Sequence, residues 1–437
     1  MRTQSLKRFA RYSSLSVWGM IAVSCYILAD TFFVSLGLGK DGLAALNLAV
    51  PAYNFIHGTG LMIGMGGATR YSICRSRGDE EGASQAFANS LYLTAFFSVL
   101  FVAAALLASR QLTALTGADE AVFAMTHTYL QVLLLFSPAF LLNDLLVCFV
   151  RNDGDPRLSM IATIGGSLSN VVLDYLFIFP CGMGIFGAVF ATGLAPVIGI
   201  AIMGPYWVGK RRGFHWIPGR PRLSLSGKLL SLGFPSLVGQ VSTGIVMILL
   251  NAIILRLEGN TGVAAYGVVA NLALVTTAVY TGIAQGIQPL ASREYGLGQV
   301  REAQRYLKYA MVTMAVASLV LYGVLFFFAD PVAAIFNSEG DARLQAIAAH
   351  GIRLYFLSAL FAGFNTVLTT YLPSVEQTLP AHVLSLLRGL VVILPVAFLF
   401  AALWGMDGVW LAVPATELLV AAAGAAVYGK TREKAAG

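Results

Sequence analysis

The sequence predicts an all-α integral membrane protein whose twelve transmembrane helices form two six-helix bundles. The first observation is composition: 57% of the 437 residues are apolar and 11% are charged, whereas soluble domains carry about 25% charged residues. The second is a series of apolar runs of about 20 residues, the length that crosses a hydrocarbon core. The third is an internal repeat at an offset of about 220 residues, which indicates two related halves. Together these observations exclude a soluble globular protein.

The apolar runs place the expected helices in chain order. The run after Arg8 and Arg11 is too long for the apolar region of a signal peptide, so we interpret it as an uncleaved first helix. No strand-like alternation competes with the helical interpretation. The expected spans are 13–36, 45–70, 86–108, 123–149, 158–180, 185–208, 228–256, 262–290, 306–328, 345–371, 378–403 and 408–429.

The internal repeat rests on short matches that keep one register. The segment from Gly42 to Ala45 matches the segment from Gly262 to Ala265, and Asn143 matches Asn365. Six helices is an even number, so the two halves would enter the membrane in the same orientation, related by a pseudo-two-fold axis along its normal. Secondary transporters of this plan bind substrate between the halves. The expected domains are residues 1–209, a cytoplasmic linker at 210–227 rich in basic residues, Gly and Pro, and residues 228–437. Further matches are Gly60 with Gly282, Pro156 with Pro380, and Gly184 with Gly405.

Basic residues predict the orientation of the chain. With the N-terminus inside, only Lys40, Arg110, Arg256, Arg343 and Arg353 of the 28 lysines and arginines fall on the outer side. The positive-inside rule produces this asymmetry. We therefore expect a multi-pass protein of the inner (plasma) membrane with both termini cytoplasmic. The net charge of +7 then reflects topology and attraction to anionic lipid, and calls for no nucleic acid partner.

Two acids lie inside apolar runs of the first half. Asp174 sits in the segment 170–179, and Asn170 lies one turn earlier on the same helical face. An acid near the bilayer centre costs about 2.5–3.5 kcal/mol, so it normally faces a cavity, a partner or an ion. Asp30 in the first helix lies at a similar depth, and two close carboxylates take up a proton or share a cation. We predict ion coupling at Asp30, Asp174 and Asn170, with H+ or Na+ as the ion; an interhelical hydrogen bond of Asp174 and an interfacial position of Asp30 remain open.

Other polar residues in the helices are candidates to line a substrate cleft. His57 could relay protons or bond a neighbouring helix, and Asn54 lies near it. Glu417 is the one acid in the middle of a second-half helix, which makes it a candidate to bind cationic cargo or to form a packing hydrogen bond. Asp144 lies close to Arg151, so we expect it to pair with a cytoplasmic base. Gln285 and Gln288 offer neutral polar contacts in the second half.

Missing motifs narrow the class of protein. The sequence has no GxxxxGK[ST] run and no HExxH run, so we expect neither a nucleotide-hydrolysing engine nor a metal enzyme. The four cysteines are scattered, which indicates neither zinc nor a disulfide framework. We expect a transporter of small organic molecules with no cofactor. Two alternatives remain: a lipid-intermediate flippase, which would need a strongly cationic cleft, and, less favoured, a membrane-embedded lipid-modifying enzyme, which would need a constellation of catalytic groups.

Several stretches in order resemble the multidrug and toxic compound extrusion (MATE) family, in the branch that includes DinF-like and MepA-like bacterial exporters. The resemblance covers essentially the whole chain. It implies two six-helix bundles forming a V around a central cleft, a monomer, and export of organic, often cationic compounds against a H+ or Na+ gradient. The residues that carry it are ADTFFV around Asp30, GLAALNLAVP at 42–51, FVRNDGDPRLSM at 149–160, NVVLDYLFIF at 170–179, GIFGAVFAT at 184–192 and AQGIQPLASREYGLG at 284–298.

The resemblance also assigns roles in the first half. The acidic positions of the family match Asp30 and Asp174, and Asn170, Asn143 and Thr192 match their polar neighbours. The NorM-like branch has an acid in helix 7 after its proline, whereas this chain has Gln240 and Ser242 after Pro235. This difference argues against a second-half coupling site of that kind, so we expect ion coupling chiefly in the first half.

Overall fold

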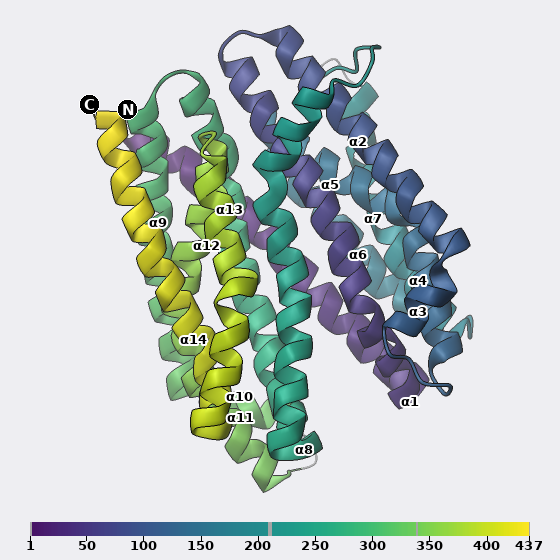
Figure 1. Cartoon of the computed structure of the whole chain (residues 1–437). Coiled ribbons are helices and arrows are strands. Elements are labelled where there is room, and N and C mark those ends of the chain that lie inside the picture. The colour runs from purple at the N-terminus through teal and green to yellow at the C-terminus, as the bar shows by residue number, and fades with distance from the viewer. Residues whose placement is uncertain (1, 209–211, 338–339, 437) are drawn as a thin grey trace. The chain divides into compact units, whose positions relative to one another are not determined.

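The computed structural model describes residues 2–208, 212–337 and 340–436, and within them every regular element is a helix (Figure 1). Residues 209–211, where the predicted linker begins, lie outside the described residues. The predicted all-α fold is confirmed. The elements are α1 (Arg2–Ser76), α2 (Glu80–Leu107), α3 (Ser109–Leu115), α4 (Phe123–Leu135), α5 (Ser137–Asn152), α6 (Pro156–Ile178), α7 (Gly184–Val208), α8 (Leu223–Gly296), α9 (Val300–Phe327), α10 (Ala329–Phe336), α11 (Ala342–Tyr355), the 3₁₀ turn η1 (Phe356–Ser358), α12 (Ala359–Ser374), α13 (Thr378–Leu386), the π-turn η2 (Leu387–Val391) and α14 (Ile393–Ala436).

Left-handed glycines divide the longest helices into the predicted spans. The backbone leaves the helical region at Gly39 (φ 66°) in α1, at Gly259 (φ 65°) in α8 and at Gly405 (φ 58°) in α14. Only glycine adopts such angles without steric cost. The described residues form eight segments that are long and apolar enough to span a membrane, or nine if α4 and α5, bent by 48°, make one span. Three of the nine segments contain such a glycine; counting each of these three as two spans gives the predicted twelve.

The same backbone turns recur in both halves of the chain. Gly78 ends α1 with a φ of 77°, and its repeat partner Gly298 follows α8 with a φ of 73°. Gly154 has a φ of 102° between α5 and α6, where the second half has Glu376 with a φ of 58° between α12 and α13. Among the described residues Glu376 is the one non-glycine residue with a positive φ. The conformation of the turn therefore follows the repeat even where the residue type does not.

The chain forms two compact units. One contains Ser14–Val241 and Ser292–Gln299, and the other contains Met1–Ser13, Ser242–Ala291 and Val300–Gly437. Each unit thus takes most of one half of the chain and a short piece of the other half. The predicted boundaries at 209 and 228, the V-shaped arrangement and the central cleft stay predictions.

Small residues explain why the start of α8 packs with the first half. A Cβ atom on Gly66 would lie 1.9 Å from the backbone oxygen of Leu229, and one on Gly233 would lie 1.8 Å from that of Met62. Such distances leave no room for a side chain, so α1 and the start of α8 touch backbone to backbone.

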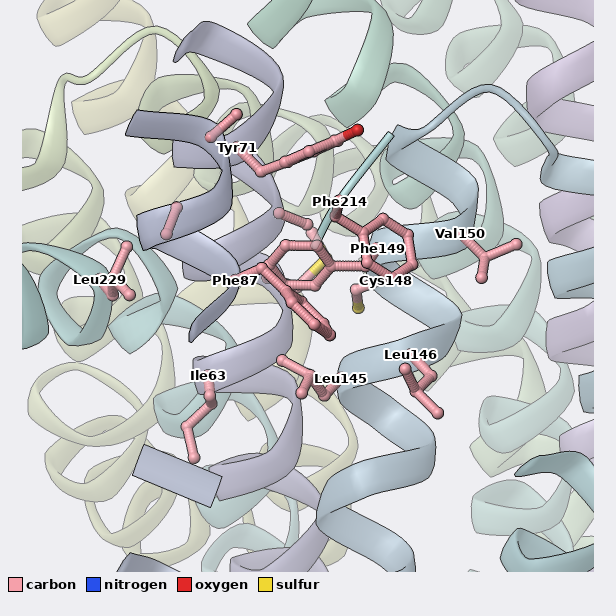
Figure 2. Packing of buried hydrophobic residues seen from close by; sticks show 14 of the residues in the cluster. Ile63, Tyr71, Phe87, Leu145, Leu146, Cys148, Phe149, Val150, Phe214 and Leu229 are labelled. Atoms are coloured by element: carbon pink, nitrogen blue, oxygen red, sulfur yellow. The ribbon is translucent and has the colours of Figure 1, made fainter. Parts of the chain in front are cut away.

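An aromatic cluster holds the segment that leads into α8. Phe214 is fully buried, with its ring centroid 4.7 Å from Phe87 and 5.5 Å from Phe149 (Figure 2). The backbone N–H of Gly213 donates to the Asp153 carboxylate at 2.7 Å, and Arg75 forms an ion pair with the same carboxylate. The segment just before α8 is therefore attached to the first half by the packing of Phe214 and by the hydrogen bond from Gly213 to the Asp153 carboxylate.

Candidate functional site

Asp30 on α1 and Asp174 on α6 lie together in the Ser14–Val241 unit. Their side chains are within hydrogen-bonding reach of each other when one carboxyl group carries a proton. They are buried, with 7% and 0% of the residue exposed, and the Oδ1 atom of each has no hydrogen-bond partner. Among the residues that the structure describes, no basic side chain forms an ion pair with either acid. This pair of acids therefore lacks the positive charge that burial of a carboxylate demands.

Asn170 and Thr192 connect this acid pair to α7. With the amide of Asn170 oriented to satisfy both its atoms, its nitrogen donates to Asp174 Oδ2 at 3.1 Å and its oxygen accepts from the backbone N–H of Thr192 at 3.1 Å. The Thr192 hydroxyl donates to the backbone oxygen of Ala188 at 3.1 Å. The structure thus brings four predicted coupling residues into one buried polar group.

Local sequence explains how α6 and α7 come so close. The side chain of Asp155 caps the start of α6 by accepting from the backbone N–H of Leu158 at 3.0 Å, and Pro156 occupies the first turn. Further along, a Cβ atom on Gly166 would lie 2.9 Å from the backbone oxygen of Ala195 in α7. This close approach lets an Asn side chain on α6 reach the backbone of α7.

Tyrosine hydroxyls complete the surroundings of the acids. Tyr129 on α4 is buried within hydrogen-bonding reach of the Thr192 side chain. The hydroxyls of Tyr26 and Tyr53 lie 2.6 Å apart, and Tyr26 is one turn before Asp30 on α1. Sequence reasoning missed these residues because a tyrosine in an apolar run is typical of packing. Their position near the acids depends on contacts between helices.

Asn143 lies apart from the other predicted coupling residues. Its side-chain oxygen is buried without a hydrogen-bond partner, against Gly199 of α7, where a Cβ atom would lie 2.5 Å away. Gly199 is two helical turns beyond Thr192, or about 10 Å along the helix axis. Among the residues that the structure describes, no hydrogen bond joins Asn143 to the acid pair, and its role in coupling stays a prediction.

His57 forms a second polar pair in the same unit. Its Nδ1 atom lies 2.8 Å from Asp144 Oδ2, and the Tyr53 ring stacks on it with centroids 5.8 Å apart. The expectation that Asp144 pairs with a cytoplasmic base was wrong, because the close approach of α1 and α5 at Gly60 brings His57 to it. Asn54 lies half-buried one turn before His57.

The second-half candidates lie in the other unit. Gln285 and Gln288 are buried in the last part of α8. The buried carboxylate of Glu417 on α14 accepts from Arg388 Nε at 2.8 Å and from Asn365 Nδ2 at 2.6 Å. The positive-inside rule predicts that Arg388 lies in a cytoplasmic segment. The structure instead places it on the π-turn η2, inside the helical segment that begins at Thr378. An isolated arginine carries no local sign that it pairs with a residue of another helix.

The MatE family model matches residues 16–176 and 235–399, which is more than half of the chain. The chain belongs to the MatE family. It is 25% identical over 434 residues to the Multidrug export protein MepA of Staphylococcus saprophyticus, covering 98% of this chain and 94% of that protein.

Two solved structures share the fold over 99% of this chain and 96% of theirs, each at 25% identity. One, with a TM-score of 0.91, is described as an outward-facing multidrug resistance MATE family transporter of the MOP superfamily. The other, with a TM-score of 0.90, is a MOP superfamily transporter from Pyrococcus furiosus described by a binding pocket of reverse polarity that suggests a different function. These findings confirm the prediction that the chain is a multi-pass transporter of the MATE family. The alternative of a membrane-embedded enzyme is therefore not supported.

Proposed function

We propose that this MATE family chain is a secondary active antiporter that exports small organic, cationic compounds in exchange for H+ or Na+. The printed name of the Staphylococcus relative supports a multidrug cargo. The single observation that supports ion coupling is the buried pair of Asp30 and Asp174, because two adjacent carboxylates without a basic partner require a proton or a metal cation.

The surroundings of this pair suit either ion. The unpartnered Oδ1 atoms of Asp30 and Asp174 can accept a proton or bind a hard cation, for which oxygen is the preferred ligand. Asn170 and Thr192 hold Asp174 in place and link its charge to α7. No separate cofactor is needed, since the ion gradient supplies the free energy.

Exchange follows if the ion and the cargo bind two conformations unequally. Occupancy of the acid pair would favour one packing of α1, α6 and α7, and cargo would favour the other. A ligand shifts such an equilibrium by its difference in affinity for the two states. Coupling therefore does not require the ion and the cargo to touch.

Cargo contacts are proposed at His57, Asn54, Gln285, Gln288 and Glu417. Glu417 is the weakest member of this set, because Arg388 and Asn365 already bond its carboxylate. A cationic cargo would have to displace Arg388 to reach it. We further propose that the protein acts as a monomer in the inner (plasma) membrane, surrounded by lipid, with both termini in the cytoplasm, as its basic residues favour.

Ethidium efflux from proteoliposomes tests the coupling role. An imposed pH gradient and an imposed Na+ gradient are compared for the wild type and for Asp174→Asn, which keeps the shape of the side chain and removes its charge. We expect one gradient to drive efflux by the wild type and neither to drive it in the variant, a loss of at least about tenfold for the removal of one charged hydrogen bond.

Asp407→Asn is the matched control, because Asp407 is an exposed acid that pairs with His350 at the surface. It should transport like the wild type. Normal efflux by a well-folded Asp174→Asn protein would exclude Asp174 as the coupling acid.

A further inference from the structure

The second-half unit contains a buried charge pair that spans three helical segments. Arg388 on η2 donates from Nε to Glu417 Oε1 at 2.8 Å and from Nη1 to Thr366 Oγ1 on α12 at 3.0 Å. Asn365 donates to Glu417 Oε2 at 2.6 Å and to the backbone oxygen of Glu417 at 2.8 Å. The Glu417 side chain is 9% exposed and the Arg388 side chain 27% exposed.

The repeat indicates that the two charges belong together. The register that aligns Gly184 with Gly405 aligns Pro196 with Glu417, and the register that aligns Pro156 with Pro380 aligns Ile164 with Arg388. For any offset between 220 and 224 residues the first half has no charged residue at either position, whereas the second half has both charges. A buried carboxylate without compensation is strongly destabilising, and a guanidinium within hydrogen-bond distance compensates it.

The oxygen atoms around the guanidinium are those that a small cation would use. Glu417 supplies two carboxylate oxygens, and Thr366 supplies a hydroxyl, all within one partly buried cluster. Carboxylate and hydroxyl oxygens are the ligands that hard cations prefer. Arg388 is a permanent cation attached to the chain, because a guanidinium does not deprotonate in proteins.

We propose that Arg388 is a tethered counter-ion that fills a latent cation site formed by Glu417 and Thr366. The side chain holds this site closed to mobile cations, so the second half keeps a fixed charge while the acid pair of the first half has none. The wide π-turn η2 presents Arg388 toward α14, and π-turns are frequent at functional positions. The inference stands on this cluster alone and does not require that Asp30 and Asp174 couple transport.

The test removes the tether and asks whether a mobile cation replaces it. Arg388→Gln is compared with Arg388→Gln/Glu417→Gln, Arg388→Lys and the wild type by thermal unfolding in detergent. One arm exchanges choline chloride for NaCl at pH 8.5 and constant ionic strength, and the other lowers the pH to 5.5 in choline chloride. Cation binding at the acid pair of the first half is common to all four proteins and cancels in the comparison.

We expect Na+ to raise the Tm of Arg388→Gln, relative to the double variant, by about 2 °C or more, the effect of one site well above its Kd, and acid to raise it as a check that Glu417 is left unpaired. The wild type and Arg388→Lys should show no such excess, because their tethered cation persists. A purely structural ion pair also predicts the excess in acid, because an unpaired buried carboxylate takes up a proton, but it predicts no excess in Na+ in any variant; the Na+ arm therefore decides. Tyr280 and Tyr355 also interact electrostatically with Glu417, but they are present in all four proteins and cancel likewise.

Two results would overturn the proposal. One is an equal response of Arg388→Gln and the double variant to Na+, since Glu417 and Thr366 would then form no cation site. The other is the same Glu417-dependent excess in the wild type, since Arg388 would then leave the site open. If Arg388→Gln does not fold, Glu417→Gln tests the pairing instead, because it leaves the Arg388 guanidinium unpaired. Replacing gluconate with chloride should then raise the Tm of Glu417→Gln more than that of the double variant. An equal effect of chloride on both proteins would refute the pairing.

Discussion

At the scale of single residues, buried carboxylates in this chain have two different environments. Asp30 and Asp174 lie next to each other with no basic partner among the described residues, whereas Glu417 has Arg388 within 2.8 Å. Because a buried carboxylate without compensation is costly, we propose that the first pair binds a mobile ion, whereas Arg388 already compensates Glu417. We propose that polar neighbours such as Tyr129 adjust how strongly the first pair would hold such an ion.

Removal of the Tyr129 hydroxyl should weaken ion coupling without preventing folding. In Tyr129→Phe the Thr192 side chain loses a buried partner, and we expect the ion concentration for half-maximal efflux to rise about 3- to 10-fold, corresponding to a bond worth about 1 kcal/mol. Measurement of efflux against ion concentration checks this prediction.

Tyr322→Phe is the control for Tyr129→Phe, because Tyr322 lies in α9 of the other unit. Its half-maximal ion concentration should stay that of the wild type. A shift of equal size in both variants would mean that Tyr129 has no specific role.

At the scale of elements, glycines in the left-handed region decide where one span ends and the next begins. Gly39 and Gly259 have nearly the same backbone angles in the two halves, and a Cβ atom added to either would have open space within 4 Å. Crowding by neighbouring atoms therefore does not explain why these two positions are glycine. The positive φ angle of the backbone does.

Gly39→Ala and Gly259→Ala should each lower stability by about 1–2 kcal/mol, the cost of a left-handed conformation for an L-residue. Gly267→Ala is the matched control, since Gly267 lies inside the helical part of α8, also with open space around it. It should be neutral or stabilising by up to about 1 kcal/mol. Thermal unfolding in detergent distinguishes the three, and equal effects would show that the angle at Gly39 and Gly259 does not matter.

At the scale of the whole molecule, the arrangement of charge along the chain predicts its orientation in the membrane. Basic residues concentrate in alternate segments, including the stretch from Arg212 to Lys228 that leads into α8. Since short basic loops stay on the cytoplasmic side, every second loop should face inward.

Cysteine labelling in intact cells tests this orientation. In a protein whose four cysteines are replaced by serine or alanine, Lys40→Cys and His215→Cys each add one thiol at an exposed position. A membrane-impermeant maleimide should label Lys40→Cys in intact cells and His215→Cys only after the membrane is opened. The reverse pattern would invert the proposed topology, and labelling of both in opened membranes controls for accessibility.

The sequence by itself determined the number, order and approximate limits of the helices, because the length of an apolar run and the breaks at glycine are local properties. It also singled out Asp30, Asp174 and Glu417 as acids within apolar runs, since a charge in such a run stands out, and left open whether Asp30 lies at the interface. The tertiary structure brings Asp30 and Asp174 together, as the sequence predicts, but only the tertiary structure decided that His57 meets Asp144 and that Arg388 meets Glu417. His57 and Asp144 lie 87 residues apart, and Arg388 and Glu417 lie 29 residues apart in consecutive spans. The close packing that brings each pair together leaves no periodic signal in either segment.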